Sequence, residues 1–214
     1  MNSTPRHFTR QGFTLVGLLI IIAVLGILAA MLIPALVSAK GKSKRIQCVS
    51  NLKQDGLAFR LWEGDNGDKY PMAVSTNKNG TMEYAADVFR HFQVMSNELS
   101  TPKILVCPAD DRTAAASFAR LKNQNVSYFV SLDAMEVRPP MLLTGDRNVT
   151  NGLSPVRSVL ELRPEIPAGW TEALHNGVGN IGLADGSVQQ VSIPGLQQML
   201  KHTGDSTNRV ALPE

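Results

Sequence analysis

The residues best suited to chemistry in this sequence are a histidine and two aspartates in its C-terminal half. Nine residues separate His175 from the pair Asp185-Gly186, and Asp146 lies upstream in the segment TGDRN. An imidazole beside carboxylates can transfer protons or bind a metal ion. The same residues also have structural uses, because Asp-Gly favours a two-residue turn and a histidine can satisfy a nearby backbone group.

Sequence motifs that would favour catalysis or metal binding do not accompany these residues. A zinc site needs three or four converging ligands, and neither HExxH nor CxxC occurs in the sequence. No serine lies in a GxSxG context, and no Gly-rich phosphate loop is predicted. The sequence therefore predicts no catalytic residue, no metal ligand and no cofactor. It favours structural roles for His175, Asp185 and Gly186. Asp146 could lie beside His175 as a polar pair at strand ends, where hydrogen bonds that order a loop are expected rather than catalysis.

A second candidate for ion binding is the acidic segment EGDNGDKYP. Asp65, Asn66 and Asp68 could supply the oxygen ligands that calcium prefers. The spacing of an EF-hand loop, which ends in a glutamate at its twelfth position, is absent here. The glycines and the proline of the segment are typical of a turn, so we expect a solvated turn.

The two cysteines, Cys48 and Cys107, have two possible states. An even number of cysteines outside the cytosol permits one disulfide, whereas two buried free thiols are the alternative. We expect a disulfide if this part of the chain is exported.

The N-terminal region contains a long uncharged stretch. Residues 11–39 contain no Asp, Glu, Lys, Arg or His. As a helix, 29 residues would extend about 43 Å, whereas a bilayer core needs only about 20 residues. A buried core helix and a cleaved signal peptide are the alternatives, but this stretch is too long for the apolar region of a signal peptide. We therefore predict a transmembrane helix.

Charge elsewhere in the chain is modest. The formal net charge is +3, which gives no indication of nucleic-acid binding. Two arginines precede the apolar stretch, and a larger basic cluster follows it at residues 40–45. The positive-inside rule would place that larger cluster, and the rest of the chain, in the cytoplasm.

The residues GFTLVGLLIIIAVLGILAAMLIPAL resemble the N-terminus of type IV pilins and type II secretion pseudopilins. In that family a short basic leader ends in Gly, and Phe follows at the cut. The resemblance implies cleavage after Gly12 by prepilin peptidase, N-methylation of Phe13, and a helix-kinking proline at Pro34. It also implies insertion into the inner membrane with the globular part in the periplasm, against the positive-inside rule.

Further segments resemble a group of bacterial pseudopilin-like proteins. These segments are CVSNLKQDGLAFRLWEGDNGDKYP, LVCPAD and HNGVGNIGLADGSV, the last with the His-x9-Asp-Gly signature of that group. The resemblance implies kinship over nearly the whole chain and assembly with other pseudopilin subunits.

Gly17 departs from the family pattern, which has Glu at the fifth mature position. In the family that carboxylate pairs with the terminal amine of a neighbouring subunit, and a buried charge is tolerable only when it is paired. Two explanations follow: a minor or tip subunit with no subunit above it, or a divergent paralogue or anchored protein that never polymerises. Gly17 and Gly26 would also allow close packing of membrane helices.

Local patterns predict an α+β fold with one long N-terminal helix from residue 13 to about 62, packed on a small antiparallel sheet. Its second half should bury the side with Ile46, Val49, Leu57 and Leu61, with Leu52 and Phe59 at the border. Short helices are predicted at 84–95, 114–121 and 194–203, strands at 103–107, 126–132 and 140–146, and a hairpin at 179–192.

The predicted organisation has five parts: a leader at 1–12, a transmembrane helix at 13–37, its amphipathic continuation at 38–62, a globular domain at 63–203 and a mobile tail at 204–214. The predicted function is that of a pseudopilin-like structural subunit rather than an enzyme. The alternative is a membrane-anchored extracytoplasmic binding module or enzyme that uses the prepilin segment only for export.

Overall fold

The computed structural model describes residues 15–214, without the side chain at position 35. The predicted leader at 1–12 and the cleavage position at Gly12 and Phe13 lie outside the described residues. The chain divides into two units, at residues 1–40 and 41–214.

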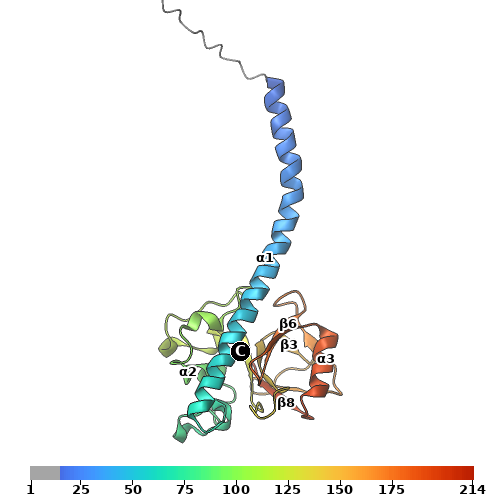
Figure 1. Cartoon of the computed structure of the whole chain (residues 1–214). Coiled ribbons are helices and arrows are strands. Elements are labelled where there is room, and N and C mark those ends of the chain that lie inside the picture. The colour runs from blue at the N-terminus through green and yellow to red at the C-terminus, as the bar shows by residue number, and fades with distance from the viewer. Residues whose placement is uncertain (1–14) are drawn as a thin grey trace, which may run out of the picture. The chain divides into compact units, whose positions relative to one another are not determined.

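The first described element is helix α1, Leu15–Asp65, which is 51 residues long and contains Pro34 (Figure 1). An 18-residue window of this helix has a mean hydropathy of 3.1 and contains no buried residue. By length and composition α1 is able to cross a membrane.

The second unit, residues 41–214, is built on an antiparallel sheet with the strand order β4-β8-β1-β2-β6-β7. The six strands are β1 (Tyr128–Ser131), β2 (Leu142–Asp146), β4 (Val159–Leu162), β6 (Gly179–Leu183), β7 (Val188–Val191) and β8 (Asn208–Ala211). A two-stranded sheet pairs β3 (Val149–Thr150) with β5 (Gly169–Trp170). The helices are α2 (Val88–Gln93), α3 (Ile193–His202) and five 3-10 turns: η1 (Pro71–Ala73), η2 (Thr76–Lys78), η3 (Pro102–Leu105), η4 (Phe118–Arg120) and η5 (Asn123–Asn125).

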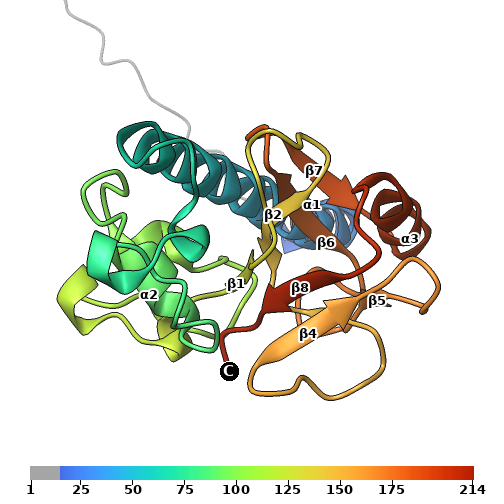
Figure 2. The same ribbon diagram turned by 90° about the horizontal axis from the view of Figure 1, so that it is seen from below.

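Each face of the large sheet contributes to a separate hydrophobic core. One core combines the part of α1 in the second unit with α2 and with Tyr128 and Val130 of β1. The other contains Phe129 of the same strand and includes Leu196 and Leu200 of α3. Successive strand residues point to opposite faces, so β1 contributes to both cores. Figure 2 shows α2 and α3 on opposite sides of this unit. The α+β fold with a long helix on a small antiparallel sheet is therefore confirmed.

The predicted buried face of α1 is wrong. Ile46, Leu57 and Leu61 are 64%, 57% and 52% exposed, whereas Leu52 and Phe59 are fully buried. The buried face also carries polar residues, including Asn51 and Asp55. Because polar residues interrupt the face that is buried, the spacing of apolar residues predicted burial of the opposite side of the helix, which is exposed.

Two local predictions and the tail also need correction. Residues 103–107 form no strand, because η3 occupies most of the segment, and only η4 forms within 114–121. The predicted mobile tail at 204–214 contains strand β8, which lies between β4 and β1 inside the sheet. Val210 and Ala211 of β8 are fully buried. The polar residues that precede the strand led to the prediction of a mobile tail. The strands at 126–132 and 140–146, the hairpin and the last helix are confirmed.

Candidate functional site

Four side chains converge in the second unit, although they are far apart in the sequence. Cys48, Cys107, Asp146 and His175 each place one potential ligand atom so that all four atoms lie within 4.8 Å of one another. His175 Nε2 is 3.3 Å from Cys107 Sγ and 3.5 Å from Asp146 Oδ2. The side chains of His175 and Asp146 are 2% and 0% exposed. The cluster is therefore closed to solvent.

Asp146 reaches the cluster because of an irregularity in β2. The β2–β6 pairing shifts register between Leu142 and Thr144, and such a bulge re-aims the following side chains. Asp146 then pairs with Tyr128 across the sheet, and directly opposed residues share a face. Tyr128 belongs to the core beneath α1, so Asp146 also faces α1.

Gly145 is required beside this bulge. A Cβ at this position would lie 2.6 Å from the ring of Phe129. Phe129 opposes Gly145 in the register of β1 and β2 and is fully buried. Any larger residue would therefore displace the strand that carries Asp146.

His175 is aimed by a loop with left-handed backbone geometry. His175, Asn176 and Gly177 have φ values of 53°, 55° and 73°, a conformation that non-glycine residues adopt rarely. Asn148 holds this loop, because its Nδ2 donates to the carbonyl oxygens of Thr171 at 2.8 Å and Leu174 at 3.1 Å. Backbone strain of this kind persists only where surrounding contacts enforce it.

The two cysteines come from α1 and from the segment after η3. The structure joins them as a disulfide with a Cα–Cα distance of 5.2 Å and a sequence separation of 59. An ion pair fixes the same segment, since Arg147 Nε and Nη2 each donate to a carboxylate oxygen of Asp110 at 2.8 Å. Burial, the largest single effect, raises the pKa of the Asp110 carboxyl. Hydrogen bonds with Arg147, Ser127 and Asp111, together with the charge of Arg147, outweigh it and hold that pKa below its usual range.

Burial dominates the electrostatics of the cluster. It raises the pKa of Asp146 to about 7, although Asn180 donates two hydrogen bonds to Asp146 Oδ2. Burial, together with the charge of Arg45, lowers the pKa of His175 to about 4. Arg45 Nε donates to Asn180 Oδ1 at 3.3 Å. Both members of the His–Asp pair are thus shifted toward their uncharged forms.

The geometry does not match a catalytic relay. In a Cys-His-Asp or Ser-His-Asp relay, the histidine uses one ring nitrogen for the nucleophile and the other for the carboxylate. Here both contacts are made by Nε2 of His175. The arrangement therefore lacks the two-sided histidine of a catalytic relay.

The other residues singled out in the sequence lie outside this cluster. Asp185 and Gly186 form the turn of the β6–β7 hairpin, where Gly186 has a φ of 82° and Asp185 Oδ1 accepts from the Ser187 amide at 2.8 Å. The structure therefore brings His175 to Asp146 and places Asp185 in the turn. In the acidic segment, Asn66 Nδ2 donates to the Trp62 carbonyl at 2.7 Å. This hydrogen bond lies at the C-terminal end of α1, whose last residue is Asp65.

The spacing GxGxxG occurs in GVGNIG at residues 177–182. A dinucleotide-binding loop needs this motif between a strand and the start of a helix. Here its second half lies within strand β6. The glycines instead admit close neighbours, since a Cβ at Gly179 would lie 2.3 Å from the Trp170 ring.

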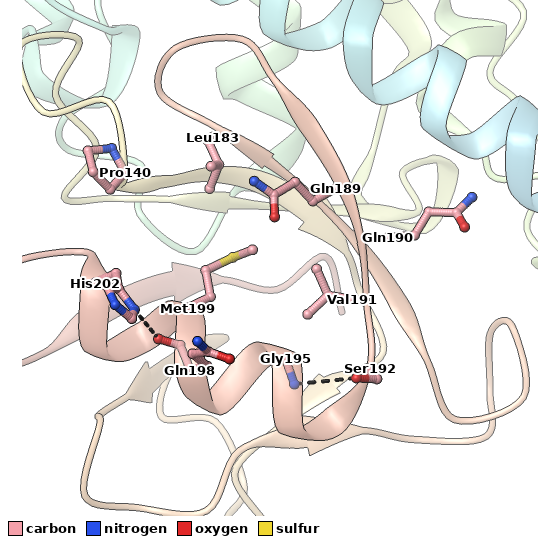
Figure 3. A pocket seen from close by; sticks show the side chains of 10 residues that line it. All are labelled: Pro140, Leu183, Gln189, Gln190, Val191, Ser192, Gly195, Gln198, Met199 and His202. Carbon is pink, nitrogen blue, oxygen red and sulfur yellow. Dashed lines mark hydrogen bonds between the residues drawn. The ribbon is translucent and has the colours of Figure 1, made fainter.

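A separate surface hollow of about 390 Å³ lies between the β6–β7 hairpin and α3 (Figure 3). Ten residues line it: Pro140, Leu183, Gln189, Gln190, Val191, Ser192, Gly195, Gln198, Met199 and His202. Two of its polar side chains make local hydrogen bonds at α3. Ser192 Oγ accepts from the Gly195 amide, and His202 Nδ1 contacts the Gln198 carbonyl. The lining is mostly amide and apolar and contains no carboxylate.

Several residues that build the cluster carried no clear signal in the sequence. Asn148, Asn180 and Arg45 act through hydrogen bonds to segments distant in the sequence. The partly buried ion pair between Asp110 and Arg147 was also missed. The one available signal was the position of Asp146, Arg147 and Asn148 directly after a strongly apolar strand.

The described residues thus form an α+β protein with one helix long and apolar enough to span a membrane. Its domain contains the cluster of Cys48, Cys107, Asp146 and His175. Part of the chain is similar to two curated proteins with the same description. It is 33% identical over 64 residues to "Type II secretion system core protein G" of Pectobacterium carotovorum subsp. carotovorum, covering 30% of this chain and 40% of that protein. It is 33% identical over 66 residues to the protein of that description from Klebsiella michiganensis, covering 31% and 46%.

The chain thus spans less than half the length of these curated relatives. No protein-family model matches the chain. No solved structure matches it either.

Proposed function

We propose that this chain is a pseudopilin-like structural subunit of a type II secretion or type IV pilus-like assembly. The observation that carries the proposal is helix α1, which begins as a membrane-length apolar segment and continues as one helix into the antiparallel domain. The similarity to core protein G of two bacteria supports the same class of protein. The helix would pack laterally against like helices, first in the inner membrane and then in a filament.

Small residues in the apolar part of α1 suit such packing. Gly26, Ala29 and Ala30 lie within about one turn of each other along the helix. Membrane helices associate through close packing at small residues, because lipid provides no hydrophobic drive between helices.

An apolar stripe on α1 in the second unit is a further candidate contact. Ile46, Leu57 and Leu61 are all more than half exposed and lie within roughly 60° of one another around the helix. We call these three residues the exposed stripe. Burying them against a neighbouring subunit would remove apolar surface from water.

The maturation steps are part of the proposal. Prepilin peptidase would cleave after Gly12, Phe13 would be N-methylated, and the globular domain would lie in the periplasm. Gly17 has no carboxylate to neutralise the terminal amine of a neighbour. It therefore supports a minor or tip subunit, with a divergent protein that never polymerises as the alternative.

The competing proposal is a membrane-anchored binding module or enzyme. Such a protein needs functional groups that a substrate can reach. The converging polar cluster at His175 and Asp146 is buried, and this burial favours the structural role.

The test is co-isolation of pseudopilus subunits with the tagged chain from cross-linked membranes of the native cell, with mass-spectrometric identification. A stripe variant, Ile46→Gln with Leu57→Gln and Leu61→Gln, should recover at least about tenfold less of the pseudopilus subunits. That change corresponds to ~1.4 kcal/mol of binding free energy. A matched control with Lys53→Gln and Gln54→Ala changes exposed positions of the same helix and should behave as wild type. Wild-type protein that recovers no pilus or secretion subunit would contradict the proposal.

A further inference from the structure

We propose that the reduced chain binds one zinc ion through Cys48 Sγ, Cys107 Sγ, His175 Nε2 and the Asp146 carboxylate. This inference does not depend on the proposed function. It concerns a site in the second unit that holds α1, the segment after η3, the end of β2 and the loop before β6 together.

The first argument is convergence. Four potential ligand atoms lie within 4.8 Å of one another, and they come from four separate segments. Two sulfurs, one imidazole nitrogen and one carboxylate oxygen form a complete tetrahedral zinc set. Calcium and magnesium prefer oxygen ligands, so a site with two sulfurs and one nitrogen favours zinc over either of them.

The second argument is an unsatisfied group inside the cluster. Asp146 is fully buried, and among the described residues its Oδ1 has no hydrogen-bond partner. Leaving a buried carboxylate oxygen unpaired costs free energy. His175 Nε2 is 3.5 Å from the other oxygen, Oδ2, which already accepts two hydrogen bonds from Asn180. A cation in the cluster that binds the carboxylate through both oxygens would supply the partner that Oδ1 lacks.

The third argument is the environment of Cys107. The Ala109 amide donates to Cys107 Sγ at 3.4 Å, and an N–H donor stabilises negative charge on sulfur. Metal binding requires the thiolate rather than the thiol. The backbone after Cys107 is therefore already arranged for the ligand form.

The fourth argument is the shell around the ligands. Asn180 donates to Asp146 Oδ2 through its backbone and its side chain, at 2.8 and 2.9 Å. Two thiolates, one carboxylate and Zn²⁺ leave one net negative charge. Arg45, hydrogen-bonded to Asn180, supplies a nearby positive charge. Such outer partners orient ligands and tune metal affinity.

Metal binding and the disulfide are alternative states of the same cysteines. Zn²⁺ binding releases one proton from each thiol and transfers no electrons. The disulfide is two electrons more oxidised, and its sulfurs cannot act as thiolates. Two ligands of a tetrahedral zinc lie about 3.8 Å apart, so the sulfurs must separate from their bonded positions. Both states link α1 to the segment after η3 through the two cysteines, and the zinc state would add the end of β2 and the loop before β6.

The test uses the full chain in detergent, purified under a phosphine reductant without metal and then titrated with Co²⁺ and Zn²⁺. We expect one equivalent of Co²⁺ to give the intense visible bands and the thiolate charge-transfer band of a tetrahedral site, and Zn²⁺ to displace it. His175→Asn keeps a residue that tolerates left-handed backbone geometry. Since loss of an outer partner alone costs 10–100-fold, this variant should bind at least about 100-fold more weakly.

Controls separate the site from general binding. His202→Asn removes an exposed histidine and should leave the cobalt spectrum unchanged, whereas the air-oxidised chain should show no bands. A reduced, folded chain that binds neither ion would overturn the proposal. So would binding that His175→Asn and Asp146→Asn leave unchanged, or a reduced chain that is unfolded by circular dichroism and that Zn²⁺ does not refold.

Discussion

At the scale of single residues, the domain is held by a few buried polar contacts between distant segments. Asp110 and Arg147 connect the segment of Cys107 to the end of β2. His91 contacts Thr81 Oγ1 at 2.6 Å through Nδ1 inside the core. Each contact is specific, because burial makes an unpaired partner costly.

Removing Arg147 should destabilise the domain strongly. The Asp110 side chain is 1% exposed, and Arg147→Ala leaves that carboxylate without its two-pronged partner. We expect a loss of about 3 kcal/mol in the free energy of unfolding, measured by urea unfolding with tryptophan fluorescence. Arg163→Ala breaks an exposed pair with Glu161 and should cost less than about 1 kcal/mol. Equal effects of the two variants would contradict a structural role for the buried pair.

His91 should make stability depend on pH. Burial lowers its pKa to about 4, although Asp87 opposes this shift. The unfolded chain therefore binds a proton below its ordinary pKa of 6.5, while the folded chain does not until about pH 4. Stability from this group is complete above pH 6.5 and is lost as the pH falls toward 4.

The measurement compares wild type with His91→Asn, because other groups titrate in the same range. The difference in unfolding free energy between them should shrink by about 3 kcal/mol from pH 7 to pH 4. A difference that stays constant over this range would show that His91 does not titrate as described.

At the scale of elements, helices and strands with a clear local sequence pattern were predictable. A helix face that mixes apolar and polar residues, and a strand that depends on distant partners, were not. The hairpin at 179–192 followed from Asp185-Gly186 between two strand-like runs, and the last helix from its apolar spacing. The buried face of α1 was misassigned because Asn51 and Asp55 occupy it. Strand β8 was missed because its place between β4 and β1 depends on pairing with distant strands.

The site was predictable only in part. A polar pair of His175 and Asp146 was expected from their positions near strand ends, and the structure brings these residues together. Their meeting with Cys107 depends on the bulge in β2 and on the loop held by Asn148. Neither feature has a local sequence pattern.

The two faces of α1 can be distinguished by matched truncations. Phe59 is fully buried and packs edge-to-face on Tyr70 and Phe92, so Phe59→Ala should cost about 3–5 kcal/mol of unfolding free energy. Leu61 is 52% exposed, and Leu61→Ala should cost about 0.5 kcal/mol or less. Denaturant unfolding of the two variants checks this, and a larger loss for Leu61→Ala would reverse the assignment of faces.

At the scale of the whole molecule, one helix supplies both a membrane-length apolar segment and part of a folded core. The apolar window of α1 in the first unit contains no buried residue, whereas residues of α1 in the second unit contribute to a core. A subunit that moves from a membrane to a filament needs both properties. The proposed function rests on this combination.

A charge in the apolar segment should disrupt it. Ala30→Arg places a cation where membrane insertion costs about 3 kcal/mol at the helix centre. We expect loss of membrane insertion or of assembly, measured by carbonate extraction and by co-isolation with pilus components. Ala30→Leu changes size without charge and should leave insertion intact. Unchanged insertion and incorporation of Ala30→Arg would count against a membrane-spanning helix.

The most direct test of the central claim is the N-terminus of the mature protein, determined by mass spectrometry on membranes of the native cell. The proposed function predicts a chain that begins at N-methylated Phe13, with residues 1–12 removed. An intact Met1, or a start at another residue, would contradict processing by prepilin peptidase. The apolar segment would then be a plain anchor for a domain with a different function.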